Sequence, residues 1–497
     1  MNNVRTNKKF LIVFLSLLLA FLIPFATLAV VTFLVPVYDD TFVGELGHKY
    51  DLLCSTDDEK IVVIGGSSVA FGLDSDLIEE KLGKKVVNFG LYADLGTKIM
   101  LDLSRANINE GDTIIIAPEL SDQTLSLYFN AETAMQALDG SFFDMIGYID
   151  EDNREALVGE IWGFVAKKLD YIISGRSPEN DGAYRKDNFN PDNGDNDYDR
   201  PYNVMTSVSK TITLDYIYDA GDDTVTEYEQ FIDYVNEYIE FCNEKGATVY
   251  FSFAPMNASA LTDYNTQETI DAFYENFTNS VNCRVISDVN DYIMDEGYFF
   301  DSEFHLNNSG VPVRTVRLID DIKRERGDTS VTMNAGELPS PSGYQPIDFA
   351  DGDEENIYFI LEEAVTGAGQ EVYYVVGLTD EGKKQVSLRV PNNTNGKAII
   401  RICEGALEGA EVRTLVLGEN IKSLDSGSLG GAPNLKAVYV PHASPAAISV
   451  PIAIDENGLA TKGAPKDLVI YVPKGRLARY LDDYFWMAYS GMLREQA

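Results

Sequence analysis

The chain has 497 residues, which is too long for one ordinary core and indicates two or three folded units. Hydrophobic residues make up 45% of it, and this excludes wholesale disorder. With 79 acidic and 39 basic residues the net charge is −40, which excludes a surface built for nucleic acid because like charges repel at long range.

The N-terminal segment predicts a membrane anchor. An almost uninterrupted apolar run covers residues 10–35, which is longer than the about 20 residues that a bilayer span needs. Basic residues precede the run, and Asp39 and Asp40 follow it, so the chain beyond residues 1–37 is expected outside the cell. A cleavable signal peptide is the alternative, because the small residues at 26–29 resemble a cleavage site.

Short apolar strands alternate with helical patterns in the next part of the chain. Strands are expected at 60–65, 85–89, 113–117, 248–253 and 284–287, and helices at 77–82, 97–106 and 226–245. Continuous apolar strands joined by helices predict a parallel sheet covered on both faces. We therefore expect an α/β domain over 38–326.

A large insert at 121–216 interrupts this pattern. Its middle, 177–202, is rich in Asp, Asn, Gly and Pro and is expected to be a mobile loop or lid over the carboxyl edge of the sheet. The run 192–199 offers closely spaced oxygen ligands but lacks the ordered spacing of a calcium loop. A solvated loop is favoured over an ion site, and no metal site is expected.

The sequence pattern changes after residue 326. A linker is expected at 327–350, followed by a β-rich domain over 351–497. Short strands are expected at 386–391, 414–417, 437–441 and 468–473. The first two intervals between them fall within the about 20 to 29 residues of a leucine-rich repeat.

One serine and one histidine are candidates for nucleophilic catalysis. Ser67 follows a glycine pair at the end of the first strand, where a tight turn exposes a side chain at the carboxyl edge of the sheet. Such a turn alone could equally be only a turn or hold a phosphate. His305 follows the last strand, and Asp301 or Glu303 could orient its ring. His48 and His442 lie away from this edge.

These segments resemble SGNH/GDSL hydrolases over residues 58–325. Gly65-Gly66-Ser67, Asn88-Phe89-Gly90 and the segment 301–305 stand where that family has its first, second and last blocks. The resemblance implies a flavodoxin-like three-layer fold, with Ser67 rather than Ser68 as nucleophile, His305 as base, Asp301 as its carboxylate and the Gly90 amide in the oxyanion hole. The layout is similar to membrane-anchored DltD-type and polysaccharide O-acylation enzymes of cell envelopes.

Two departures from the family pattern stand out. The third block normally supplies an oxyanion-hole asparagine, whereas the third strand here is followed by Glu119, which is either a substrate contact or a solvated helix cap. An absent donor costs about 10²-fold or more in rate. Asp301 lies four residues before His305 instead of three, with Glu303 as its competitor.

The C-terminal part resembles BspA-like leucine-rich repeats from 414 to 441, and 471–486 looks like the cap of such an array. This resemblance implies a surface for a protein partner. Cys242 and Cys283 precede neighbouring strands, so a disulfide is possible between them in an extracytoplasmic protein.

The sequence therefore predicts an extracytoplasmic, membrane-tethered serine acyl-esterase or O-acyltransferase without a cofactor. Its expected substrate is a cell-surface polysaccharide or teichoic-acid-like polymer, and no nucleic acid is expected as a partner. The alternative is a non-catalytic surface protein, in which a degenerate SGNH domain carries the repeats as a binding face.

Overall fold

The computed structural model describes residues 2–178, 180, 182–205, 208–219, 225–451, 458–483 and 485–496. The chain divides into two compact units. The first comprises Met1–Asn203 with Ser209–Ser342, and the second Val204–Val208 with Gly343–Ala497.

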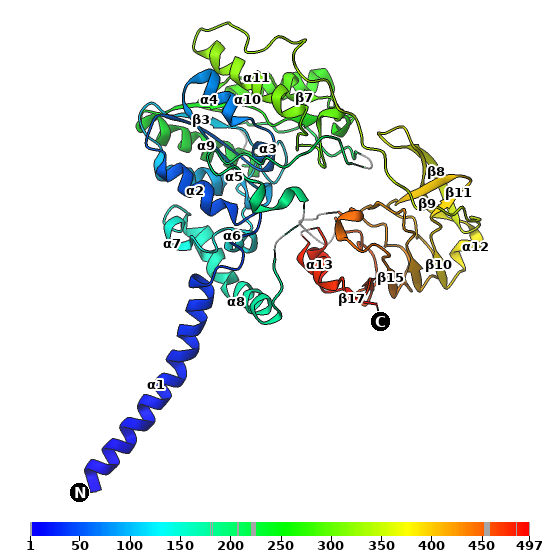
Figure 1. Ribbon diagram of the computed structural model, residues 1–497, viewed down its shortest axis with the longest axis horizontal. Coiled ribbons are helices and arrows are strands. Elements are labelled where there is room, and N and C mark those ends of the chain that lie inside the picture. The colour runs from blue at the N-terminus through cyan, green and yellow to red at the C-terminus, as the bar shows by residue number, and fades with distance from the viewer. Residues whose placement is uncertain are drawn as a thin grey trace. The chain divides into compact units, whose positions relative to one another are not determined.

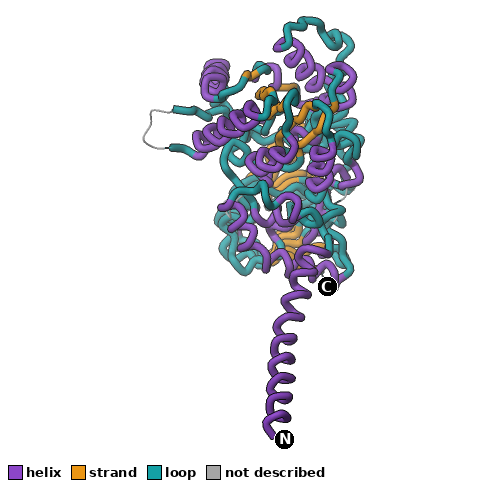
Figure 2. Tube along the Cα trace, turned by 90° about the vertical axis from the view of Figure 1, so that its left-hand side faces the viewer, coloured by secondary structure: helices purple, strands orange, loops and turns teal. Residues whose placement is uncertain are grey.

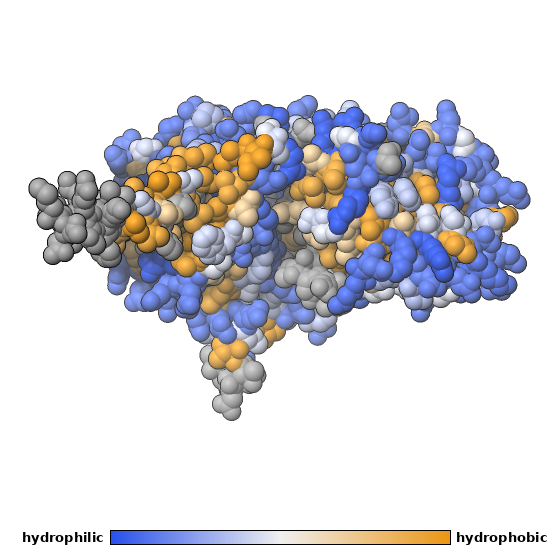
Figure 3. All heavy atoms as spheres, turned by 90° about the horizontal axis from the view of Figure 1, so that it is seen from below, coloured by the Kyte–Doolittle hydropathy of each residue, from blue (hydrophilic) through white to orange (hydrophobic). Residues whose placement is uncertain are grey.

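The first unit begins with one long helix, α1 (Asn2–Leu34), which is labelled in Figure 1. Its part Ser16–Leu34 is apolar and long enough to be a membrane span or a signal sequence, by length and composition. Most of its described side chains are exposed, and Figure 3 shows hydrophobic side chains gathered along it and beside it. The apolar helix expected from the sequence is therefore present.

The rest of this unit alternates strands and helices and is interrupted after β3 by a helical insert. The elements are α2 (Glu45–Ser55), β1 (Lys60–Gly65), α3 (Ser67–Ala70), α4 (Ser75–Leu82), β2 (Lys85–Gly90), α5 (Thr97–Ser104), β3 (Thr113–Ile116), α6 (Ala131–Ala137), α7 (Phe142–Met145), α8 (Glu151–Ser174), α9 (Glu227–Glu244), β4 (Thr248–Phe251), β5 (Met256–Asn257), α10 (Gln267–Ser280), β6 (Arg284–Val285), β7 (Ile293–Met294) and α11 (Gly310–Glu325).

Five of these strands form a parallel sheet in the order β2-β1-β3-β4-β6. Both faces are apolar, as continuous hydrophobic strands require. Helices α4 and α11 pack on the face that carries Ile61 and Val63, while α5 and α9 lie against the other face. Figure 2 shows these strands among the helices. The α/β architecture and its five strands agree with the sequence prediction.

The insert differs from the expected mobile lid. It contains helices α6, α7 and α8, and its Asp/Asn-rich loop is packed into the unit instead of being solvated. The Asp195 carboxylate is buried and accepts hydrogen bonds from Ser75 N and Oγ and from Asn88 Nδ2, each 2.7 Å long. Burial raises the pKa of Asp195 to about 6 in spite of these donors. The expectation of a solvated run at 192–199 is wrong for Asn193, Asp195 and Asn196, which are buried, whereas the loop lies at the carboxyl edge as expected, since Tyr184 contacts Asp301.

The boundary after α11 also differs from the expected linker. Thr332 donates to Asp320, Tyr298 donates to the Pro339 carbonyl, and the Ser342 amide donates to the Gly297 carbonyl. Hydrogen bonds thus hold much of 327–342 on the first unit.

The second unit is rich in strands, as expected. Its elements are β8 (Phe359–Val365), β9 (Glu371–Leu378), α12 (Asp380–Lys383), β10 (Ser387–Arg389), β11 (Asn393–Thr394), β12 (Lys397–Ile402), β13 (Thr414–Val416), β14 (Ser423–Leu424), β15 (Ala437–Tyr439), β16 (Val469–Val472), α13 (Leu477–Asp482) and β17 (Leu493–Glu495).

Strands β10, β13, β15, β16 and β17 form a parallel sheet in chain order. Leu388, Leu415, Val438, Ile470 and Leu493 stand side by side in its register, and all five are buried. Successive turns of chain thus add one strand each to a common core, which is the arrangement that a repeating sequence produces.

All four cysteines are free thiols, so the disulfide that the sequence allows between Cys242 and Cys283 is not formed. Cys242 is fully buried at the end of α9, where burial raises the pKa of its thiol to about 11. Cys283 lies in the turn before β6 and is only partly covered.

Replacing Asp195 tests whether the insert loop supports the sheet edge. Asp195→Ala leaves the Ser75 and Asn88 donors without their acceptor, and the free energy of unfolding should fall by about 3 kcal/mol. Asp192→Ala removes an exposed carboxylate from the same loop and should change the free energy of unfolding by less than about 0.5 kcal/mol. Urea unfolding of the full chain in detergent measures both values. Equal values for the two variants would contradict a supporting role for Asp195.

Candidate active site

The site begins at the carboxyl end of β1, where two successive glycines have close neighbours. A Cβ on Gly65 would lie 2.5 Å from Val69 Cγ2 and 2.6 Å from the Ala117 carbonyl oxygen. A Cβ on Gly66 would lie 2.4 Å from Glu119 Oε2. The chain therefore turns tightly and places Ser67 at the first residue of α3, at the sheet edge where α/β proteins bind ligands.

Three side chains from distant segments meet at this edge. His305 Nε2 lies 2.8 Å from Ser67 Oγ, although the two residues are 238 positions apart in the sequence. His305 Nδ1 lies 2.8 Å from Asp301 Oδ1. With Nδ1 protonated, the imidazole donates to the carboxylate and accepts from the serine hydroxyl, which is the arrangement of a nucleophile, its base and an orienting acid.

The choice between the two carboxylates is settled by position. Phe300 N donates to the His305 carbonyl at 2.8 Å, so the chain between them folds back and brings Asp301 beside the ring of His305. Glu303 instead accepts from Thr211 Oγ1 at 3.3 Å on the exposed side of the turn. The structure therefore brings Asp301 to His305 in spite of the unusual four-residue spacing.

Two aromatic residues fix the imidazole, and neither was found by sequence reasoning. The Phe71 ring stacks on the His305 ring, with centroids 4.5 Å apart and planes 10° apart. The Tyr184 hydroxyl donates to Asp301 Oδ2 at 2.8 Å and lies 3.3 Å from His305 Nδ1. Tyr184 belongs to the insert, and no local motif marks it. Together they leave His305 7% exposed and restrict its rotation.

The amide of Gly90 has a partner within the protein. Gly90 N donates to Asn88 Oδ1 at 3.2 Å, and a Cβ at Gly90 would lie 2.4 Å from Val69 Cβ. Gly90 therefore allows β2 to approach α3 closely. Asn88 Nδ2 donates to the Val69 carbonyl at 2.9 Å, so this asparagine joins the second segment of the site to the first.

Glu119 lies beside the nucleophile and is buried, not solvated. Its Oε1 accepts from Ser68 N at 2.6 Å and lies 3.4 Å from Ser67 Oγ, while its Oε2 is buried without a hydrogen-bond partner among the described residues. Arg314 Nη1 donates to the Ser68 carbonyl, so the Ser68 peptide is held from both ends. Burial lowers the pKa of Arg314 to about 10, and the charge of Glu119 opposes this shift.

The remaining candidates do not join the site. His48 contacts Glu45, and His442 Nε2 donates to the Glu419 carbonyl in the second unit, where burial lowers the pKa of His442 to about 4. Within the described part of the chain no cluster of His, Cys, Asp and Glu is suited to a metal ion.

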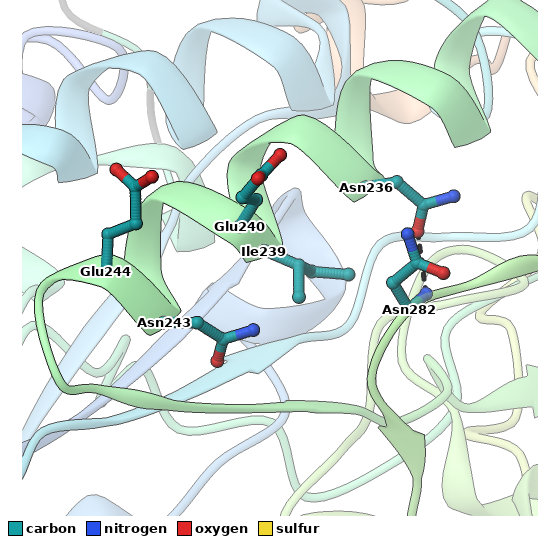
Figure 4. Close-up of a pocket in the computed structure, with 6 residues that line it drawn as sticks. All are labelled: Asn236, Ile239, Glu240, Asn243, Glu244 and Asn282. Atoms are coloured by element: carbon teal, nitrogen blue, oxygen red, sulfur yellow. Dashed lines mark hydrogen bonds between the residues drawn. The ribbon is translucent and has the colours of Figure 1, made fainter.

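A surface hollow elsewhere on the first unit lacks a nucleophile. Figure 4 shows it between the end of α9 and the turn before β6, where Asn282 N donates to Asn236 Oδ1 at 2.7 Å. This is the amino edge of the sheet. The side chains that line it are Asn236, Ile239, Glu240, Asn243, Glu244 and Asn282.

The sequence matches no known protein family in a scan of family profiles, and a search of curated proteins finds no similar sequence. The site is therefore interpreted from its own geometry.

Removing the Tyr184 hydroxyl tests its positioning role. Tyr184→Phe keeps the ring but deletes the donor to Asp301, so the ester turnover that the sequence leads us to expect should fall by about tenfold, while the free energy of unfolding changes by less than about 1 kcal/mol. The loss should appear in kcat rather than KM, because the hydroxyl acts through Asp301 and His305. Tyr198→Phe, which changes another insert tyrosine, is the matched control. Unchanged kcat for Tyr184→Phe would show that Phe71 and Asp301 suffice to hold His305.

Two substitutions of Glu119 separate its charge from its hydrogen bond. Glu119→Gln keeps an acceptor for Ser68 N and adds an amide donor near Ser67, so turnover should stay within about threefold of wild type or rise. Glu119→Ala removes the acceptor and leaves Arg314 without its nearby counter-charge, so turnover should fall by at least about tenfold. A Gln variant as slow as the Ala variant would show that the negative charge itself is required.

Proposed function

We propose that the protein is an extracytoplasmic serine acyl-esterase or O-acyltransferase of the SGNH type. The observation that carries the proposal is the continuous chain of contacts from Ser67 Oγ to His305 Nε2 and from His305 Nδ1 to Asp301 Oδ1, both 2.8 Å long. Such a chain serves to activate a hydroxyl.

The proposed reaction has two half-steps. His305 Nε2 takes the Ser67 proton as Oγ attacks the carbonyl carbon of an acyl ester, and the protonated imidazole then gives that proton to the departing alcohol. The acyl-enzyme on Ser67 passes its acyl group to water in an esterase or to a sugar or alditol hydroxyl in a transferase, with His305 again as base. Asp301 stabilises the imidazolium that forms in each half-step.

The parallel sheet supports the SGNH assignment. The three segments that resemble SGNH blocks follow one another along this fold. Gly65-Gly66-Ser67 lies at the end of β1, Asn88-Phe89-Gly90 at the end of β2, and 301–305 before α11. The Ser67 amide at the start of α3 is the oxyanion donor in this proposal, because the Ser68 amide donates to Glu119 and the Gly90 amide to Asn88.

The cell-envelope location rests on α1, which is proposed to span the membrane with both units outside. The substrate is then a surface polysaccharide or teichoic-acid-like polymer. The parallel strands of the second unit favour BspA-like leucine-rich repeats, which would bind the polymer or a protein partner.

A non-catalytic scaffold is the second candidate, and the oxyanion region favours it. The Gly90 amide is engaged by Asn88, and Glu119 stands where the family has an asparagine donor. A carboxylate at that position opposes a developing negative charge unless Arg314 compensates it. In this alternative the protein has the same fold but does not catalyse acyl transfer.

Turnover of p-nitrophenyl acetate by the full chain in detergent distinguishes these functions. Ser67→Ala and His305→Ala should each lower kcat by about 10³-fold or more, because members of a triad act as a unit. Ser68→Ala is the matched control, since the Ser68 hydroxyl is buried in the same turn and points to no partner among the described residues. A fluorophosphonate probe should label wild type and Ser68→Ala but not Ser67→Ala. Equal turnover by wild type and Ser67→Ala would contradict the esterase or transferase proposal and favour the non-catalytic scaffold.

A further inference from the structure

Helix α8 carries an exposed row of large apolar side chains that the proposed chemistry does not use. Counting from Val158, the other members follow four, eleven, fourteen and fifteen positions later, which places them along one side of a helix. We call this row the α8 stripe; it consists of Val158, Trp162, Leu169, Ile172 and Ile173, with exposures of 64%, 67%, 37%, 46% and 82%.

The α8 stripe borders the buried face of the helix. Leu157, Phe164, Val165 and Lys168 are buried and hold α8 on the first unit, and Val165 lies between Trp162 and Leu169 by its spacing. The charged residues Glu160 and Lys167 lie on the far side of the helix from the stripe. Five large apolar side chains in water are costly, at about 25 cal/mol for each Å² of apolar surface. An exposed apolar row of this kind marks a surface that contacts another protein or a membrane.

The end of α1 is fastened to this part of the unit. Lys168 Nζ donates to the Thr32 carbonyl at 3.1 Å and to Asp139 Oδ1 at 2.6 Å, and Asp139 Oδ2 accepts from Val37 N at 2.7 Å. Both members of the Lys168–Asp139 pair are buried, and burial lowers the pKa of Lys168. The last turn of α1 therefore cannot turn freely relative to α8.

Aromatic contacts continue the same junction onto α7. The Phe33 ring lies 5.1 Å from the Phe142 ring and 5.1 Å from the Phe143 ring, and Phe143 is itself 67% exposed. Figure 1 shows α7 and α8 next to the end of α1, and the hydrophobic surface in Figure 3 continues from α1 onto its surroundings.

We propose that the α8 stripe and Phe143 lie in the outer interface of the same bilayer that α1 crosses. The proposal rests on the membrane span assigned to α1 under the proposed function. The bilayer is favoured as occupant because the stripe adjoins the residues that hold the outer end of the span, and a large aromatic such as Trp162 suits the boundary between headgroups and acyl chains.

This contact gives the domain a second attachment and a fixed orientation. A single helix would let the folded unit swing about its junction, whereas a helix lying in the interface holds one face of the unit against the membrane. The net charge of −40 repels anionic headgroups, so the contact depends on apolar burial and should form on uncharged lipid.

Trp162 is a natural reporter of this contact. The chain has two tryptophans, and the other, Trp486, is 1% exposed in the core of the second unit. The full chain is reconstituted in phosphatidylcholine vesicles with bromine atoms near the top of the acyl chains. Bromine should quench up to about half of the tryptophan emission, because an interfacial tryptophan lies at that depth. The same vesicles should shield Trp162 from aqueous acrylamide.

A matched variant moves the reporter to the polar side of the helix. In Trp162→Phe combined with Lys167→Trp, the tryptophan should escape bromine and stay open to acrylamide. Flotation of the vesicles reports the α1 span separately. A chain that floats while Trp162 remains open to acrylamide overturns the stripe proposal and leaves the anchor intact. Shielding without bromine quenching also overturns it, since a protein partner or second copy then covers the stripe. A chain that fails to float overturns the anchor itself.

Discussion

The hydrogen bond between Ser67 Oγ and His305 Nε2 is the contact on which the account depends. It joins the turn after β1 to the segment before α11, and it exists because parallel strands bring their carboxyl ends to one edge of a sheet. The glycines before Ser67 allow the turn, and the fold-back of 300–305 delivers both Asp301 and His305.

The insert is part of the site and not a cover added to it. Asp195 ties the start of α4 to Asn88, and Tyr184 holds the carboxylate that orients the imidazole. The same insert provides α8, which fastens the end of α1. The insert between β3 and α9 therefore links the end of α1 to the edge of the sheet that carries Ser67. The carboxylate and amides of this polar loop satisfy donors of neighbouring turns, which is how the loop can be buried.

Local patterns were sufficient for the strands, the apolar helix and the meeting of Ser67 with His305. The strands are continuous apolar runs. Ser67 follows β1 of the five-stranded sheet, and His305 comes after its last strand β6 and the short strand β7, so their meeting at the carboxyl edge agrees with the order of the strands. The packing of the insert against the sheet edge was not predictable in this way. Asp195 and Tyr184 bind partners about a hundred residues away, and no local spacing marks them. The burial of Glu119 depends likewise on Gly66 and Arg314. Whether Cys242 and Cys283 form a bridge was left open by the sequence, because strand order does not fix the approach of two thiols.

The central claim is that Ser67 carries an acyl group during turnover. Rapid acid quenching of the full chain mixed with p-nitrophenyl acetate, followed by mass spectrometry of its peptides, tests this directly. The account predicts one acetyl group on the peptide that contains Ser67, formed by wild type and lost when His305 is replaced by alanine. An unmodified Ser67 peptide during measurable turnover, or the same acetylation with and without His305, would contradict it.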